Sequence, residues 1–378
     1  MQIEQRYWLP NQGWSAEPSE LGKSAGLVFV FGSPQTLVDP RHLASLHDAY
    51  PKAIFFGCST AGEICGTRVF DDSLVVTAVR FDSTRIAQAS VEIGNNGDTS
   101  TACGERLVKA LDPKGLTHVL VLSDGVHVNG SELVRGMLKH VPPGVQITGG
   151  LSGDGTRFER TFVLSNGGPA ERRVAALAFY GSRLKVGYGS LGGWDSFGPE
   201  RMITRSKANV LYELDNRPAL GLYKEYLGEH AAGLPATGLL FPLSIRLADG
   251  EQVVRTILGV DEKEQSMTFA GDVPEGVHGR LMKANFDRLI DGAQGAAKTS
   301  YEAVGSASPD LAILISCIGR KLVLKQRTEE ELEATAGVLG SKTVLTGFYS
   351  YGEICPSAPN ANCSLHNQTM TITTFSER

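Results

Sequence analysis

The chain has 378 residues, of which 42% are hydrophobic and 20% are charged, and its formal net charge is −5. This length and composition predict a soluble globular protein of two or three domains. The negative charge and the lack of a basic stripe argue against a nucleic-acid partner, because phosphates demand a basic face. Residues 1–24 carry no apolar signal segment, and no run approaches the roughly 18 apolar residues of a spanning helix. We therefore expect a cytoplasmic protein without membrane insertion.

The cysteines are too few and too scattered for a disulfide framework in a chain of this length. Reduced thiols are therefore predicted, and no pair shows the C-x2-C spacing of structural zinc sites. The cysteines are Cys58, Cys65, Cys103, Cys317, Cys355 and Cys363.

A polar lead-in over 1–26, expected to be loosely ordered, precedes the first of three similar units. Each unit consists of a short apolar run, a helical stretch, a second short apolar run and a Gly/Ser-rich turn. Short Val/Ile/Leu runs joined by a helix are typical of parallel strand-helix-strand units. We therefore predict an α/β fold of mixed sheets in two domains, built on these repeats. The units begin at Leu27, His118 and Leu311 and end in the turns near Glu63, Gly155 and Glu353.

The segments between the units predict further strands and helices. Residues 71–81 and 85–93 are predicted as a hairpin, and a helix is expected over 98–111. Closely spaced apolar runs over 161–193 suggest antiparallel strands. Residues 206–214 and 219–228 are predicted as helices on either side of Asn216-Arg217-Pro218, and a long helix is expected from Asn285. The Pro-marked junction divides the chain into predicted domains 26–215 and 216–378.

The Gly/Ser-rich turns are the candidate ligand sites, because open α/β sheets bind ligands at the carboxyl ends of their strands. The turns at 57–65 and 347–355 share the pattern G-x4-G-E-I-C, and we expect them to face one another across the domain interface. Their acidic groups suit a small amine-bearing ligand such as an amino acid. The candidate ligand-binding residues are Ser59, Thr60, Glu63, Ser152, Asp154, Glu353 and Asn367.

Six motifs in order give the chain a resemblance to the FIST family, which joins a FIST N domain to a FIST C domain. They are GCSTAGEI, TGGLSGDG, FPLSIR, GDVPEG, GFYSYGEI and LHNQT, and the resemblance runs from about Gly26 to the C-terminus. It implies an intracellular ligand-binding sensor that is not a catalyst. Similar members include bacterial nitric-oxide-sensing proteins, which bind haem and inhibit a sensor histidine kinase. The resemblance therefore implies nitric oxide as ligand and such a kinase as partner, with amino-acid-like sensing without haem as the alternative.

A haem sensor needs an axial iron ligand in an otherwise apolar pocket. His366 is the best candidate, with Phe348, Tyr349 and Tyr351 expected to pack on the porphyrin. In the competing interpretation, His366 and Asn367 are structural polar groups that hydrogen-bond the two turns together. His127 and His278 are weaker ligand candidates.

A hydrolase is the less favoured alternative. It would use Ser59 or Ser152 as nucleophile and His366 as base, with Glu63, Asp154 or Glu353 as the orienting acid. However, GCSTAG reads G-x-S-x-x-G rather than the G-x-S-x-G of a nucleophile elbow. We therefore expect no catalysis, while a homo-oligomer is left open.

Overall fold

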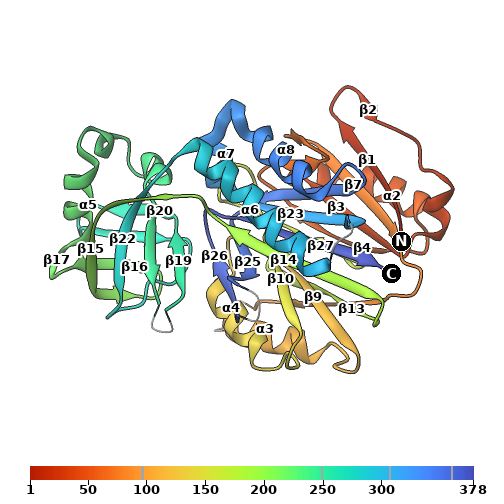
Figure 1. The fold of residues 1–378 in the computed structure, drawn as a ribbon, viewed down its shortest axis with the longest axis horizontal. Coiled ribbons are helices and arrows are strands. Elements are labelled where there is room, and N and C mark those ends of the chain that lie inside the picture. The colour runs from red at the N-terminus through yellow and green to blue at the C-terminus, as the bar shows by residue number, and fades with distance from the viewer. Residues whose placement is uncertain (95–97, 248–249, 306–307, 359–360) are drawn as a thin grey trace.

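The computed structural model shows a large core of three sheets with helices around them, and a smaller β unit at the left end of Figure 1. The core is built from chain on both sides of the β unit in sequence. The fold is α/β with mixed sheets in two parts, in agreement with the sequence prediction. The structure describes residues 1–94, 98–247, 250–305, 308–358 and 361–378.

Sheet 1 contains the first repeated unit. From one edge to the other its strands are β12 (Gly168–Ala170), β11 (Val163–Ser165), β4 (Ile54–Ser59), β3 (Leu27–Gly32), β7 (Leu74–Arg80), β1 (Gln2–Leu9) and β2 (Gly13–Trp14). Strands β3 and β4 are parallel, and helices α1 (Pro34–Val38) and α2 (Pro40–Ala49) connect them. Every residue of β3 is buried, as expected of a parallel strand covered on both faces.

The lead-in is more ordered than the sequence predicts. Strand β1 pairs along its length with β7, and the 3-10 helix η1 (Glu20–Ser24) follows it. The prediction was wrong because it was based on the polar composition of this segment. Strand β1 can be polar since most of its side chains are only partly buried.

Sheet 2 contains the second unit. Its strands are β26 (Cys363–His366), β25 (Gly352–Pro356), β10 (Gln146–Leu151), β9 (Leu116–Ser123), β13 (Arg173–Tyr180) and β8 (Arg85–Glu92). Strands β9 and β10 are parallel, and α4 (Gly130–Leu138) connects them and packs against α3 (Ser100–Lys109). Strand β8 pairs with β13 rather than β7, so the predicted hairpin is wrong. Both edges of β7 are already occupied, by β1 and β3.

Sheet 3 contains the third unit. Its strands are β6 (Arg68–Phe70), β5 (Glu63–Cys65), β24 (Val344–Ser350), β23 (Leu311–Cys317), β27 (Met370–Glu377) and β14 (Leu184–Leu191). Strands β23 and β24 are parallel, and α7 (Ile318–Leu324), η4 (Lys325–Arg327) and α8 (Thr328–Leu339) connect them. The long helix α6 (Phe286–Val304) begins after Asn285, as predicted, and packs on β14 and α8.

The three sheets follow one plan. Each sheet contains one of the predicted strand-helix-strand units, so the three units are confirmed, and each sheet also contains strands from outside its unit. Each parallel pair has an antiparallel strand on one side and a short hairpin on the other, and that hairpin comes from a different unit. Hairpin β5–β6 follows β4 in sequence but pairs with β24, hairpin β11–β12 follows β10 but pairs with β4, and hairpin β25–β26 follows β24 but pairs with β10. The units are therefore interlocked in a ring of exchanged hairpins.

Glycines at matched positions permit the close approach of the two parallel strands in each unit. Gly57, Gly149 and Gly347 lie in the second strand of each parallel pair, where the exchanged hairpin joins. A Cβ atom at these positions would lie 1.7, 1.8 and 1.8 Å from a backbone carbonyl oxygen of the parallel neighbour. Only a residue without a side chain tolerates so close an approach.

One face of each sheet contributes to a shared apolar core. Phe179 of sheet 2 and Phe375 of sheet 3 have ring centroids 5.1 Å apart, and Phe31 of sheet 1 stacks on Phe348 of sheet 3 at 4.9 Å. Burial of these aromatic rings stabilises the association of the three sheets. Within the described ranges, no helix has the length and apolar character needed to cross a membrane.

The β unit spans 195–283 and has its own apolar core. Its strands are β19 (Gln252–Arg255), β18 (Leu243–Arg246), β22 (His278–Lys283), β15 (Asp195–Lys207), β16 (Val210–Leu214), β21 (Ser266–Phe269) and β20 (Ile257–Asp261), with β17 (Arg217–Pro218) beside β16. Its helices are α5 (Ala219–Leu227), η2 (Gly228–Gly233) and η3 (Ala236–Leu240).

The helix predicted over 206–214 is wrong. These residues end β15, turn at Ala208 with φ of 51°, and form β16. A run this short fits either period, and the turn was not recognised. Residue 216 lies between β16 and β17, inside the β unit, and strands from both sides of it share sheets 2 and 3. The predicted domains 26–215 and 216–378 stay a prediction.

Candidate functional site

The turns that follow β4, β10 and β24 meet one another. The two G-x4-G-E-I-C turns lie together, as the sequence predicts, but they do so within the core and not across a domain interface. The Ala61 N–H donates to the Tyr349 carbonyl over 2.8 Å, and the Tyr349 N–H donates to the Gly62 carbonyl over 2.8 Å. The Gly153 N–H donates to the Ser59 carbonyl over 2.9 Å, and this joins the middle turn to the first. We call this meeting point the three-turn junction.

The two matched glutamates fasten these turns to neighbouring strands. Glu63 accepts hydrogen bonds from the Ser73 N–H and hydroxyl, at 3.2 and 2.6 Å, and from the Thr60 hydroxyl. Glu353 accepts from the Thr369 N–H and hydroxyl at 3.2 and 2.9 Å. Burial raises the pKa of Glu63 to about 7 and that of Glu353 to about 8, against hydrogen bonds that lower both values.

The side chains of the two candidate serines, Ser59 and Ser152, also hydrogen-bond to backbone groups. The Ser59 hydroxyl accepts from the Phe162 N–H at 2.8 Å, and the Ser152 hydroxyl donates to the Ser123 carbonyl at 2.8 Å. Both side chains are buried. The structure therefore places these hydroxyls in contacts that position strands and turns.

Asp154 organises the loop that follows the middle turn. Its carboxylate accepts hydrogen bonds from the N–H groups of Phe158, Glu159 and Arg160 at 2.8, 3.0 and 2.9 Å, and from the Tyr351 hydroxyl. Burial alone would raise the pKa of Asp154, but these hydrogen bonds outweigh it and lower the pKa. With its oxygens occupied by the loop, Asp154 acts on a ligand only through the residues that it holds.

A cavity of about 310 Å³ opens beside the three-turn junction, and we call it the Tyr351 cavity. One wall comes from the core and the other from the β unit. Of the residues predicted to bind a cofactor or ligand, the structure places Tyr351 and the weaker candidate His127 in this wall. The lining residues are Gly125, Val126, His127, Val128, Asn129, Gly130, Leu151, Phe158 and Tyr351 from the core, with Asn209, Leu258, Phe269, Ala270 and Gly271 from the β unit.

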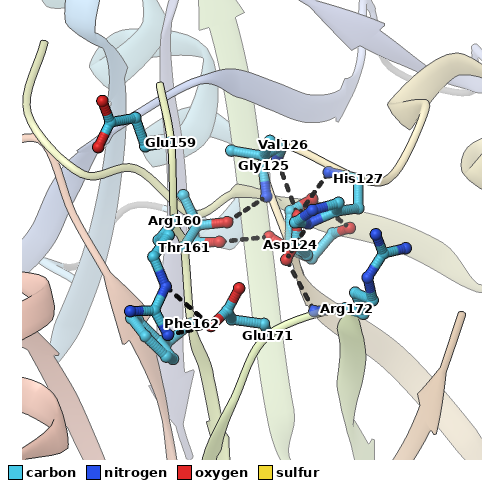
Figure 2. Close-up of polar contacts among 12 residues, drawn as sticks. Asp124, Gly125, Val126, His127, Glu159, Arg160, Thr161, Phe162, Glu171 and Arg172 are labelled. Atoms are coloured by element: carbon cyan, nitrogen blue, oxygen red, sulfur yellow. Dashed lines mark hydrogen bonds and ion pairs between the residues drawn. The ribbon is translucent and has the colours of Figure 1, made fainter. Parts of the chain in front are cut away.

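Asp124 and His127 form a pair (Figure 2), and His127 lines the core wall of the cavity. Asp124 is buried and accepts from the N–H groups of Val126, His127 and Arg172 at 2.8, 2.7 and 2.8 Å. Its carboxylate also lies 3.2 Å from Nδ1 of His127, which is partly exposed. The Thr161 hydroxyl accepts from the Gly125 N–H at 2.9 Å and closes the turn.

Sequence reasoning ranked His127 low and missed Asp124. The signal was present, because SDG follows a buried parallel strand, and such strand ends carry the functional groups of α/β sheets. The carboxylate lies three residues before the histidine, close enough to orient its ring.

His366 lies apart from the aromatic residues predicted to accompany it. Its Nε2 is 2.9 Å from the Cys355 carbonyl oxygen, and burial lowers its pKa, so the ring is neutral. The Phe348 ring stacks on Phe31 in the shared core, and the Tyr349 hydroxyl donates to Glu331 over 2.7 Å.

His366 lines a second cavity, of about 250 Å³, together with Trp194, Met282 and Thr369. Asn367, which follows His366 in the sequence, is fully buried. Neither polar atom of its side-chain amide has a hydrogen-bond partner among the described residues. A neutral imidazole suits an axial haem ligand. The walls fit less well, because the cavity is smaller than the roughly 300–1,000 Å³ of ligand pockets and its described lining includes no Lys or Arg to pair with haem carboxylates. Of the features that haem binding needs, this cavity therefore offers only the imidazole of His366 as an iron ligand.

Comparisons with known proteins identify the family. The FIST N domain matches residues 26–217, and the FIST C domain matches residues 219–356. The chain therefore belongs to the FIST family of ligand-binding sensory domains. No curated protein matches it in sequence.

Two solved structures are weakly similar to the chain. One is the cyanuric acid hydrolase of A. caulinodans, with a TM-score of 0.38 and 8% identity over 100% of this chain and 99% of that one. The other is a cyanuric acid hydrolase described as an evolutionary innovation by structural concatenation, with a TM-score of 0.33 and 8% identity over the same shares. Similarity at this level supports no inference about activity.

Proposed function

We propose that the chain is a sensor that binds a small molecule in the Tyr351 cavity and signals to a partner protein. The observation that carries this proposal is the double lining of the cavity. Tyr351 and His127 come from the core, whereas Leu258 and Phe269 come from the β unit. A molecule bound there contacts both parts of the structure at once.

Binding between two parts gives the ligand a way to change the molecule. A ligand shifts a conformational equilibrium only by its difference in affinity for the two states. Contacts to the β unit are made only when that unit lies against the core, so the bound molecule stabilises this arrangement. Asp272 of the β unit already accepts hydrogen bonds from Asn129 and Arg135 of the core, each at 2.9 Å, beside the cavity.

The partner that the family resemblance favours is a sensor histidine kinase. Such a kinase would distinguish the two arrangements by the surface that spans the core and the β unit. Autophosphorylation of a kinase from the same source, measured with the chain in its free and ligand-bound forms, tests this part of the proposal. Equal kinase activity with both forms contradicts it.

The ligand site is tested by filling the cavity with a bulky side chain. Val126 lines the cavity and is 38% exposed, and Val38 is equally exposed but does not line it. We expect Val126→Trp to weaken binding of a metabolite selected from a small-molecule panel by at least about 10-fold, and Val38→Trp to leave it unchanged. Isothermal titration measures both. Unchanged affinity in Val126→Trp places the ligand elsewhere.

A second candidate is haem-dependent nitric oxide sensing, favoured by the neutral imidazole of His366. His366 would supply the axial ligand, and bound iron would supply the nitric oxide chemistry. Visible spectra of the protein with and without added hemin test it. A Soret band that His366→Ala alters and His127→Ala leaves unchanged supports this candidate. The absence of a specific Soret band removes it.

A further inference from the structure

The described walls of the Tyr351 cavity carry no carboxylate, ammonium or guanidinium group. Among the described residues that line it, none is Asp, Glu, Lys or Arg. A zwitterion such as an amino acid would leave both its charges unpaired there, and unpaired charges are costly to bury. The nearby carboxylates of Asp124 and Asp154 already accept hydrogen bonds from backbone N–H groups. The cavity therefore favours a neutral molecule.

An aromatic platform is held at the cavity mouth. The Phe158 and Tyr351 rings are stacked, with centroids 4.2 Å apart and planes inclined by 17°. Phe158 has a φ of 56°, a region that bulky side chains rarely adopt, and its N–H is held by Asp154 and by the Tyr351 hydroxyl. The residue is still 41% exposed. A strained backbone thus keeps an apolar ring against the cavity instead of in the core.

Other exposed apolar side chains continue this platform. Val126 and Leu258 also line the cavity and are 38% and 44% exposed. They come from the core and from the β unit, so they lie on its two walls. Exposed apolar side chains that gather around one cavity mark a surface for an apolar body.

Nε2 of His127, the ring nitrogen that does not contact Asp124, can orient a bound molecule. Its Nδ1 is held by the Asp124 carboxylate, so in the neutral ring Nδ1 carries the proton and Nε2 is the acceptor. Nε2 lies on the opposite edge of a ring that lines the cavity. An N–H or O–H group of a bound molecule is its natural partner.

Resting on the proposed ligand site, we infer that the Tyr351 cavity takes a small, neutral, planar molecule, aromatic or heteroaromatic, which stacks at Phe158 and donates a hydrogen bond to Nε2 of His127. The stacking provides the apolar contact and the hydrogen bond provides orientation. The cavity volume of about 310 Å³ lies at the lower end of the range for ligand pockets, and this suits a molecule of one or two rings.

The test compares two probes that differ only in a hydrogen-bond donor with a third probe that is charged and not planar. Indole is planar and carries an N–H donor, benzofuran has the same shape without the donor, and leucine is charged and not planar. Titration followed by amide chemical shifts should show indole binding, benzofuran binding about fivefold more weakly, and no leucine binding. His127→Phe should remove the difference between indole and benzofuran. Phe158→Leu keeps apolar volume and should weaken both about 10-fold.

Each contrary outcome has a distinct meaning. Equal binding of indole and benzofuran to the unaltered protein overturns the role of His127, even where His127→Phe fails to fold. Leucine binding that Val126→Trp abolishes keeps the cavity as a ligand site and overturns the neutral, planar class. Indole binding that is insensitive to Val126→Trp overturns the assignment to this cavity. If no probe binds at millimolar concentration, the class is wrong and the sensor proposal is decided by the metabolite panel alone.

Discussion

Carboxyl groups at the three-turn junction have opposite pKa shifts because they differ in how completely they are removed from water and in how many backbone hydrogen bonds they accept. Asp154 accepts three backbone N–H groups and a phenol, and its pKa is lowered. Glu63 and Glu353 each accept one backbone N–H together with hydroxyl groups, and burial raises their pKa values. Hydroxyls can also accept from a protonated carboxyl group, so these sites tolerate the neutral form.

The glutamates predict a pH dependence of stability. The folded-state pKa values of about 7 and about 8 lie above the usual value of 4.5, so the folded state binds these protons more tightly than the unfolded chain. Their contribution is fully present below about pH 4.5 and falls as pH rises through 7 to 8. We expect the free energy of unfolding of the Glu63→Gln, Glu353→Gln double variant to fall less between pH 5 and 8 than that of the unaltered protein.

Urea denaturation at both pH values measures the difference, which should be on the order of 1–3 kcal/mol. Equal losses of stability in the double variant and the unaltered protein would show that the carboxylates are already ionised in the folded state at pH 5.

We expect removal of the Asp154 carboxylate to loosen the loop that it holds. Asp154→Ala removes the acceptor of three N–H groups and should destabilise the chain by about 1–3 kcal/mol. Hydrogen exchange at Phe158, Glu159 and Arg160 should quicken, because these amides lose their partner. Exchange at β9 serves as the internal control. Unchanged protection of the loop would mean that the stacked Phe158 and Tyr351 rings hold it without Asp154.

At the scale of elements, the local patterns of the sequence predict strands and helices well but not their partners. The three strand-helix-strand units and helix α6 follow from buried runs and a capping Asn285. The exchange of hairpins does not, because G-x4-G-E-I-C specifies the turn and not the sheet that receives the strand. The site shows the same limit. Tyr351 was chosen from its motif, whereas Phe158 and Leu258 reach the cavity only through tertiary packing.

The matched glycines give a prediction at this scale. In Gly57→Ala the new Cβ atom meets the Val30 carbonyl oxygen at 1.7 Å, so the strand pair must separate. We expect a loss of stability of about 3 kcal/mol or more. Gly337→Ala is the control, since it lies in helix α8 with nothing within 4 Å, and should stabilise by about 0.5–1 kcal/mol. Thermal unfolding measures both, and similar melting temperatures would contradict the close approach of β3 and β4.

At the scale of the whole molecule, the three sheets depend on one another and the β unit depends on them less. Each sheet of the core receives a hairpin from another unit, so no sheet is complete within one stretch of chain. The β unit leaves the core after Gly193 and returns before Asn285. These crossings lie together, because Asp195 pairs with Lys283 and accepts a hydrogen bond from the Asn285 amide at 3.0 Å. The unit is therefore an insertion at one point of the core.

This arrangement predicts which cuts the chain tolerates. Replacing 195–283 by a short Gly/Ser linker should leave a core that unfolds cooperatively, because the ends to be joined already lie side by side. The same variant should lose binding at the Tyr351 cavity, since Leu258 and Phe269 are removed. A fragment of residues 1–217 should fail to fold, because β5 and β10 lose the strands β24 and β25 that pair with them. Circular dichroism and amide spectra show which of the two shortened proteins folds. A folded 1–217 fragment beside an unfolded deletion variant would contradict the interlocked core.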